Sequence, residues 1–336
     1  MHIKRIALAL IMFGCVSISN AQEKTKISII PEPVSMTAGE GSFEVTASTS
    51  IEVNGNDSIQ KIANEFASKL SAASGLKLPV SGKQNSSSAN NKILFTSSTD
   101  KTLGTEGYSL TVTPTLVTIA SSHAAGAFYA VQTLYQMLPK EINSRTAVTT
   151  TKWIIPAATI TDYPRFGWRG LMFDVSRHFF TKADVKQFID QMVPYKYNLL
   201  HLHLTDDEGW RIEIKSLPKL TTTGAFRPTR NGKWSNSTNP DPKDPRDYGG
   251  FYTQDDIREL VKYASDRFVN ILPEIDVPGH SLATVAAYPE LSCSNGPHLI
   301  FEGKTFMDWP GPIALLDNTL CPANENVYAF LDKVFT

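Results

Sequence analysis

Residues 198–211 constrain the fold of this chain more than any other stretch. They read NLLHLHLTDDEGWR, an apolar run that alternates in part and ends abruptly in three consecutive acids. This pattern predicts a buried strand with charged side chains at its carboxyl end, Asp206 first among them. In an α/β barrel the carboxyl ends of the strands carry the active site, so the stretch indicates a barrel strand.

Two further stretches end in the same way. Residues 170–178, GLMFDVSRH, are mostly apolar and close on Arg177 and a histidine. Residues 270–280, NILPEIDVPGH, close on an aspartate, a Pro-Gly turn and His280. Strand ends are often polar, but Arg, Asp and His at three of them favour one shared site over packing alone.

A helix is predicted between each of these strands and the next. Thr181 to Asp184 and Thr253 to Asp256 both have the spacing of a capping box, and apolar residues follow each box at helical intervals. The order strand, helix, strand, helix, strand predicts parallel strands joined by right-handed crossovers.

The amino terminus has the pattern of a secretory signal peptide over residues 1–22. Two basic residues precede a short apolar run, and small residues precede Gln22. The run is too short to remain in a membrane, and we expect no other transmembrane segment. We therefore expect export to the periplasm or the extracellular space, with a lipoprotein anchored through Cys15 as the alternative; Phe13 is a poor residue two places before that cysteine.

Charge and cysteine content bound the remaining possibilities. A formal net charge of −1 over 336 residues indicates no basic face for nucleic acid. Cys293 and Cys321 remain beyond the signal peptide, and in an oxidising compartment they either form a disulfide or stay as free thiols.

Residues 23–157 are predicted to form a small α/β domain without a cluster of site residues. His123 is interpreted as a loop or cap residue and not as a ligand. Expected strands cover residues 27–33, 41–53, 92–95, 107–112 and 116–120, and expected helices cover residues 58–73 and 124–138.

Residues 158–336 are predicted to form the first part of a (β/α)8 barrel. A complete barrel takes about 250 residues, and only three barrel strands can be counted here; a smaller open α/β sheet is the alternative. Residues 215–250 form a long insertion in which Trp234 and Tyr248 either stack on a sugar or pack within their own loop.

The three strand motifs together resemble the beta-N-acetylhexosaminidases of glycoside hydrolase family 20. The motifs are residues 169–178, 201–211 and 273–280, and the domain before them also looks like that family's non-catalytic domain. The resemblance implies a (β/α)8 barrel and glycan substrates that end in a non-reducing N-acetylglucosamine or N-acetylgalactosamine. It further implies retaining hydrolysis with the substrate's acetamido oxygen as nucleophile, without a cofactor or metal ion.

The resemblance also implies roles for three side chains. Arg177 would bind sugar hydroxyls, which suits a forked donor, while Asp206 and His280 would form a polar relay that supports the general acid. A carboxylate beside an imidazole favours the imidazolium and fixes its orientation, so the relay is sound on physical grounds as well.

Two features depart from the family's pattern. Glu208 stands where many relatives carry Gln. More importantly, the family's general acid and its acetamide-orienting partner are an adjacent Asp-Glu pair, usually after two glycines, and no Gly-Gly-Asp-Glu occurs in these 336 residues. Asp207 and Glu208 belong to the second-strand motif instead. We therefore expect a hexosaminidase gene product of which residues 1–336 alone do not turn over substrate.

Two other readings remain open at this point. One is a carbohydrate-binding remnant that lacks catalysis. The other is a metal-dependent hydrolase, because His201 and His203 lie on one face of a strand and paired imidazoles bind divalent ions.

Overall fold

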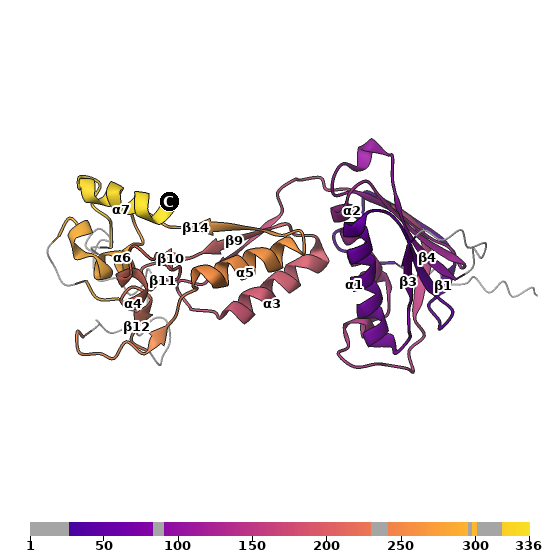
Figure 1. Cartoon of the computed structure of the whole chain (residues 1–336), viewed down its shortest axis with the longest axis horizontal. Coiled ribbons are helices and arrows are strands. Elements are labelled where there is room, and N and C mark those ends of the chain that lie inside the picture. The colour runs from indigo at the N-terminus through magenta and orange to yellow at the C-terminus, as the bar shows by residue number, and fades with distance from the viewer. Residues whose placement is uncertain (1–26, 83–90, 230–240, 295–297, 301–317) are drawn as a thin grey trace, which may run out of the picture.

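The computed structural model of the chain describes residues 27–82, 91–229, 241–294, 298–300 and 318–336. The predicted signal peptide, Cys15 and Trp234 lie outside these residues. Figure 1 shows two bodies side by side, an amino-terminal sheet covered by helices and a second body that carries the later strands. Within the described ranges, we find no helix with the length and apolar character that a membrane crossing requires.

The amino-terminal body is a seven-stranded sheet with the order β1-β7-β5-β6-β4-β2-β3. Two helices, α1 (Asp57–Ser74) and α2 (Ala124–Met137), cover one face (Figure 1). The strands are β1 (Ser35–Glu44), β2 (Ser50–Asn54), β3 (Val80–Gly82), β4 (Lys92–Ser97), β5 (Tyr108–Val112), β6 (Leu116–Ser121) and β7 (Ile154–Asp162). Both predicted helices are confirmed, and His123 is the residue before α2, in the N-cap position.

Three details of this domain differ from the prediction. Residues 27–33 form no strand, because Pro31 and Pro33 lack the N–H that a ladder needs. The predicted strand 41–53 is two strands, since Thr49 Oγ1 accepts a hydrogen bond from the Thr46 N–H and turns the chain between β1 and β2. β7 passes through the predicted boundary at residue 157 and stays paired with β1 and β5 almost to its end at Asp162.

The second body begins with three parallel strands in the order β14-β9-β8. They are β8 (Gly170–Asp174), β9 (Leu199–His203) and β14 (Asn270–Glu274). Helix α3 (Lys182–Met192) follows β8, and α5 (Gln254–Ser265) precedes β14. Both helices begin with the predicted capping box and lie side by side along one face of the sheet (Figure 1).

The strand register decides which side chains meet. Leu200 and Leu202 are fully buried in one core with residues of α3 and α5, so the alternation of the strand turns His201 and His203 to the opposite face. On that face, Asp174, His203 and Glu274 stand in one row across the three strands. The row below it contains Met172, His201 and Leu272.

Short elements build the loops at the carboxyl ends of these strands. β10 (Thr205–Asp206) and β11 (Gly209–Trp210) form a hairpin, and the long insertion contains α4 (Lys219–Thr222) and the pair β12 (Phe226–Arg227) and β13 (Tyr248–Gly249). α6 (Leu282–Ala287) and α7 (Glu325–Phe335) pack with Trp210 and Leu220 in a second core. The insertion is therefore folded in part, and not structureless as its composition suggests.

Cys293 and Cys321 form a disulfide with a sulfur–sulfur distance of 1.96 Å. It joins the segment after α6 to the segment before α7, and a backbone hydrogen bond from Cys321 N to Leu291 O lies beside it. Of the two alternatives that the sequence leaves open for these cysteines, the structure has the disulfide.

The two bodies contact each other through charged and aromatic side chains. Lys196, which follows α3, is buried and donates hydrogen bonds to Asp162 of β7 at 2.6 Å and to the Tyr108 hydroxyl of β5 at 2.9 Å. The rings of Phe128 and Phe268 lie 5.1 Å apart between α2 and the loop after α5. These contacts fix the start of the parallel sheet against the amino-terminal domain.

Candidate active site

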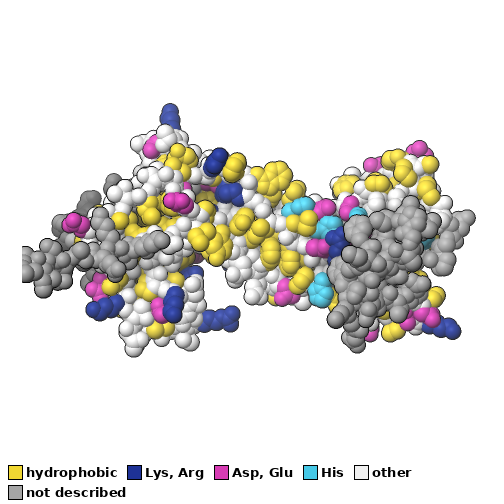
Figure 2. Space-filling model, turned by 180° about the vertical axis from the view of Figure 1, so that it is seen from behind, with side chains coloured by type: hydrophobic (Ala, Val, Ile, Leu, Met, Phe, Trp, Pro, Cys, Tyr) yellow, Lys and Arg dark blue, Asp and Glu magenta, His cyan; other side chains and the backbone are white. Residues whose placement is uncertain are grey.

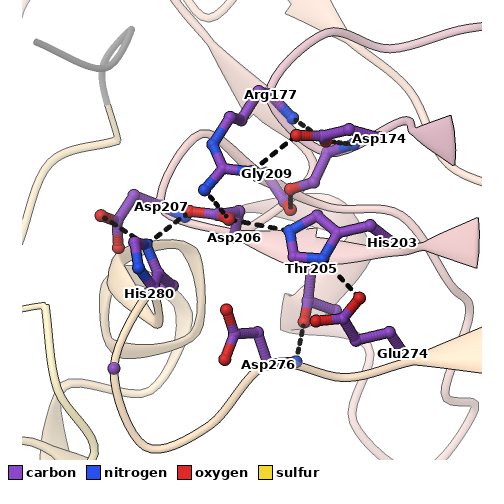
Figure 3. A network of polar contacts seen from close by, with 12 residues as sticks. Asp174, Arg177, His203, Thr205, Asp206, Asp207, Gly209, Glu274, Asp276 and His280 are labelled. Atoms are coloured by element: carbon purple, nitrogen blue, oxygen red, sulfur yellow. Dashed lines mark hydrogen bonds and ion pairs between the residues drawn. The ribbon is translucent and has the colours of Figure 1, made fainter. Parts of the chain in front are cut away.

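The candidate site lies where β8, β9 and β14 end (Figure 3). Asp174 is the last residue of β8, and Arg177 lies in the turn just after this strand. Asp206 belongs to the β10–β11 hairpin after β9, and His280 lies in the loop after β14. All three residues to which the resemblance gives a role are therefore brought together. Figure 2 shows histidine and acidic side chains gathered beside a strip of hydrophobic side chains on one face of the molecule.

Asp206 is the centre of this group. Its side chain is 1% exposed, and both carboxylate oxygens are occupied. Oδ2 lies 2.8 Å from His203 Nε2 and 2.7 Å from Arg177 Nη2. Oδ1 accepts a hydrogen bond from the Asp207 N–H at 2.7 Å and lies 3.1 Å from His280 Nδ1. Burial opposes ionisation, but these partners, His203 first, keep the pKa of Asp206 below its usual value.

Arg177 is held between two carboxylates. Nη1 donates to Asp174 Oδ2 at 2.6 Å, while Nη2 contacts Asp206. The other oxygen of Asp174 accepts the backbone N–H groups of Ser176 and Arg177, which fixes the turn after β8. Against the effect of burial, the two carboxylates raise the pKa of Arg177. With a side chain that is 35% exposed, the guanidinium keeps donors free toward the open side of the site.

His280 contacts Asp206 from the opposite side. It has a left-handed backbone with φ 53°, which a non-glycine residue seldom adopts. Its side chain is 53% exposed, and Nδ1 also lies 3.8 Å from Asp207 Oδ2. With Nδ1 directed at Asp206, the Nε2 atom is left for a partner from solvent or substrate.

The two acids after Asp206 differ from it in environment. Asp207 accepts hydrogen bonds from the Leu282 N–H and from Asn318 Nδ2, yet burial raises its pKa. Glu208 is 4% exposed, and its Oε2 has no hydrogen-bond donor among the described residues. Burial and the neighbouring carboxylates of Asp206 and Asp207 raise the pKa of Glu208 to about 8, so it is mostly protonated at neutral pH.

Arg211, the last residue of the central motif, has a structural role. It is fully buried and donates to the backbone carbonyls of Val175, Ser176 and Ala225, so it joins the end of β8 to the insertion. Gly209 lies against the guanidinium, and a Cβ at this position would be 2.2 Å from Arg211 Cζ. The glycine is required for this close approach.

Three further site residues had no predicted role. Asp174 binds Arg177, Glu274 contacts the ring of His203, and the Asp276 N–H donates to Thr205 Oγ1 at 2.9 Å. All three are acids at or just after the ends of β8 and β14, so their position at a strand end is the sequence feature that could have identified them as site residues. Their mutual contacts depend on register between strands, which the sequence does not display.

The structure gives His201 and His203 partners other than a metal ion. Both rings contact Glu274 Oε2, at 2.5 Å from His201 Nε2 and 2.9 Å from His203 Nδ1. Within the described ranges, the groups whose ligand atoms all lie within 4.8 Å are His203, Asp206 and Asp276, and Asp206, Asp207 and His280. His201 belongs to neither group, so the pair that suggested a metal-dependent hydrolase does not converge on one ligand position with a third residue.

Tyr248 of the insertion packs within the protein. Its hydroxyl lies 2.7 Å from His178 Nδ1 and accepts the Phe179 N–H, and the Arg227 guanidinium lies 4.3 Å from the ring centre. Of these contacts only Arg227 belongs to the same loop, so Tyr248 joins the insertion to the loop after β8; Trp234 lies outside the described residues.

The comparisons with known proteins agree with this site. Residues 26–163 match glycosyl hydrolase family 20, domain 2, and residues 166–336 match glycosyl hydrolase family 20, catalytic domain. The protein is thus of the class of α/β-barrel hydrolases that have a charged site at the strand ends. The chain belongs to glycosyl hydrolase family 20.

Relatives and solved structures support the same assignment. The chain is 39% identical over 309 residues to a beta-hexosaminidase of Porphyromonas gingivalis, covering 92% of this chain and 36% of that protein. It is 35% identical to a beta-N-acetylhexosaminidase of Cellulomonas fimi, covering 82% of this chain and 51% of that protein. The chain therefore spans about a third to a half of the length of these relatives.

Among solved structures, the family 20 beta-N-acetylhexosaminidase of Streptomyces coelicolor A3(2) superposes with a TM-score of 0.77 at 36% identity, covering 91% of this chain and 56% of that one. A mutant Streptomyces plicatus beta-hexosaminidase in complex with its product GlcNAc gives a TM-score of 0.76 at 36% identity, with 91% and 55% covered. The resemblance inferred from the three strand motifs is confirmed, and with it the barrel class of the second body.

Proposed function

We propose that this chain supplies the Arg177, Asp206 and His280 part of the active site of a beta-N-acetylhexosaminidase. The enzyme would remove terminal non-reducing N-acetylglucosamine or N-acetylgalactosamine from glycans. One observation carries the proposal: a buried carboxylate, Asp206, has Arg177 on one oxygen and His280 on the other at the strand ends of a family 20 chain.

The geometry suits the roles that the resemblance implies. The half-buried Arg177 has donors left over after binding two carboxylates, and a planar fork of donors matches adjacent sugar hydroxyls. Asp206 fixes the ring of His280 through Nδ1, so that Nε2 is left to face the acid that the resemblance implies. That acid and its acetamide-orienting partner would come from the family's Asp-Glu pair, which residues 1–336 do not contain.

It follows that residues 1–336 alone should not turn over substrate. The test compares the product of the source gene, read through and beyond the codon for Thr336, with the purified 336-residue chain on an aryl N-acetylglucosaminide. Hydrolysis by the gene product and background rates for the 336-residue chain would support the proposal. An inactive gene product would contradict the function. Turnover by the 336-residue chain well above background would contradict the statement that residues 1–336 lack the acid needed for catalysis.

A carbohydrate-binding remnant is the second candidate, because the side chain set suits sugar binding without the acid pair. It predicts that the gene product binds N-acetylglucosamine, measured by calorimetry, and does not hydrolyse the aryl glycoside. Loss of that binding in Arg177→Ala would place the sugar at this site.

We also propose that the chain is exported to the periplasm or the extracellular space. The signal-peptide pattern of residues 1–22 supports this, and disulfides such as Cys293–Cys321 persist in oxidising compartments. Cell fractionation tests the proposal, and lipid labelling that is lost in Cys15→Ser would favour the lipoprotein alternative.

A further inference from the structure

His203 lies between two carboxylates from different strands (Figure 3). Its Nε2 is 2.8 Å from Asp206 Oδ2, and its Nδ1 is 2.9 Å from Glu274 Oε2. The side chain is 3% exposed. The second contact is an ion pair and not an aligned hydrogen bond. The ring therefore presents both of its nitrogens to acceptor oxygens in a place that water hardly reaches.

This arrangement requires a particular protonation state. A neutral imidazole carries one N–H, so one of the two nitrogens would direct its lone pair at a carboxylate oxygen. Two lone pairs facing each other in a buried site repel each other, and burial makes this repulsion costly. An imidazolium carries a proton on each nitrogen and is attracted to both carboxylates.

The surroundings of the ring add to the same effect. Asp174 is the register neighbour of His203 on β8, and Glu274 is its neighbour on β14. Two basic side chains also lie near the ring. Arg177 contacts Asp206 Oδ2, and His201 contacts Glu274 Oε2. Asp276 and His280 also belong to the polar groups around Asp206. Burial alone would lower the pKa of His203, but the carboxylates of Asp206, Glu274 and Asp174 raise it to about 9.

The charge on His203 has a consequence for Asp206. Oδ2 of Asp206 faces two cations, His203 and Arg177, both held by other carboxylates. Oδ1 is thereby turned to the opposite side, where it meets His280. The carboxylate can neither rotate nor take up a proton on Oδ2 without losing two charged contacts.

We propose that His203 is a positioning residue: as a permanent imidazolium clamped by Glu274, it holds Asp206 ionised and directs Asp206 Oδ1 at His280. The inference deepens the proposed function and rests on it, because the orientation of His280 matters for glycoside cleavage. It also gives the His201-x-His203 pair a role without a metal ion, since both rings contact Glu274 Oε2.

The first test is nitrogen NMR of the whole chain labelled with ¹⁵N-histidine, with the His203 signals assigned by their loss in His203→Gln. Both ring nitrogens of His203 should keep N–H character up to a pH of about 9. In Glu274→Gln the midpoint should fall by about one pH unit or more, while the surface control Asp255→Asn leaves it unchanged. A midpoint near the ordinary histidine pKa of 6.5 in the unmodified chain would overturn the proposal, and this measurement needs no variant.

The second test asks whether His203 acts on Asp206. Carbon NMR of the side-chain carboxyl, assigned by loss of its signal in Asp206→Asn, gives the pKa of Asp206 in each protein. In His203→Gln we expect this pKa to rise by about one unit or more, because a cation is lost from Oδ2. His123→Gln, in the amino-terminal domain, is the matched control. An unchanged Asp206 pKa in a folded His203→Gln protein would overturn the positioning role.

Neither measurement uses a glycoside, so the two proposals fail separately. Inactivity of the gene product with both NMR results intact would remove the glycosidase function and leave the charge of His203 standing. An active gene product whose His203 titrates normally would leave the function and remove this inference.

Discussion

Asp206 Oδ1 and His280 Nδ1 lie 3.1 Å apart although 74 residues separate them in the sequence. One residue comes from the hairpin after β9 and the other from the loop after β14, where His280 has φ 53°. Because a left-handed backbone costs free energy in a histidine, the surrounding loop must impose it. The geometry of the relay is thus a property of two loops held by adjacent parallel strands.

Replacement of Arg177 by Lys should impair the proposed enzyme. A single ammonium cannot hold Asp174 and Asp206 from two separate nitrogens, as the guanidinium does. In the gene product we expect kcat/KM to fall by about 100-fold or more, which is about 2.7 kcal/mol of transition-state stabilisation. The exposed Arg258→Lys on α5 serves as the control and should keep normal kinetics; equal kinetics in both variants would contradict the role of Arg177.

Replacement of Glu208 by Gln should change how stability depends on pH. The pKa of this carboxyl is raised to about 8 in the folded chain from an ordinary value of 4.5. A raised acid pKa means that the folded state binds more protons between these values, so its contribution to stability is complete below about pH 4.5 and is lost as pH rises toward 8. Inside this window the slope amounts to about 1.4 kcal/mol for each pH unit.

Denaturant unfolding at several pH values checks this expectation. The unfolding free energy of Glu208→Gln minus that of the unmodified chain should grow from pH 5 to pH 8. Its slope should be that expected when the folded state binds about one more proton than the unfolded state. Glu290→Gln, outside the site, is the matched control. Parallel curves for Glu208→Gln and the unmodified chain would mean that Glu208 ionises normally.

Replacement of Gly209 by Ala should destabilise the second body. The new Cβ would lie 2.2 Å from Arg211 Cζ, and this guanidinium is fully buried and bonded to four different backbone carbonyls at 3.2 Å or less, so it has nowhere to move. We expect a loss of about 2 to 4 kcal/mol in unfolding free energy. Gly167→Ala, where a Cβ meets nothing within 4 Å, is the matched control. Equal melting temperatures for the two variants would refute the role of the close contact.

Reduction of the Cys293–Cys321 disulfide should lower the melting temperature. The two cysteines are 28 residues apart, and in the chain-entropy model a cross-link that closes a loop of that size in the unfolded chain stabilises the fold by about 3.6 kcal/mol. A reductant should therefore shift the melting curve of the unmodified chain and leave that of a Cys293→Ser, Cys321→Ser double variant in place. A shift of the same size in both proteins would point to another effect of the reductant.

Much of the fold was predictable because its signals are local. Apolar runs that end in charge predicted β8, β9 and β14, and the capping boxes at Thr181 and Thr253 predicted the starts of α3 and α5. The errors arose where neighbours in space override local pattern. The prolines after Ile30 prevent a strand, and β7 continues to Asp162 because β1 and β5 offer it partners on both sides.

The sequence predicted which residues form the site, but not all of the contacts between them. Arg177, Asp206 and His280 stand at strand ends in recognisable motifs, so their convergence could be inferred. The placement of His203 between Asp206 and Glu274 follows from cross-strand register, and the burial of Glu208 follows from the packing of the hairpin turn. Neither the placement of His203 nor the burial of Glu208 can be inferred from the spacing of residues along one segment.

Arg211 links the insertion to the hairpin that carries Asp206. Its guanidinium donates to the carbonyl of Ala225, inside the insertion, and to that of Gly250, at its end, and its own backbone continues the hairpin that carries Asp206. A change of chain length between these two anchors would therefore act on the hairpin of Asp206 through the Arg211 guanidinium.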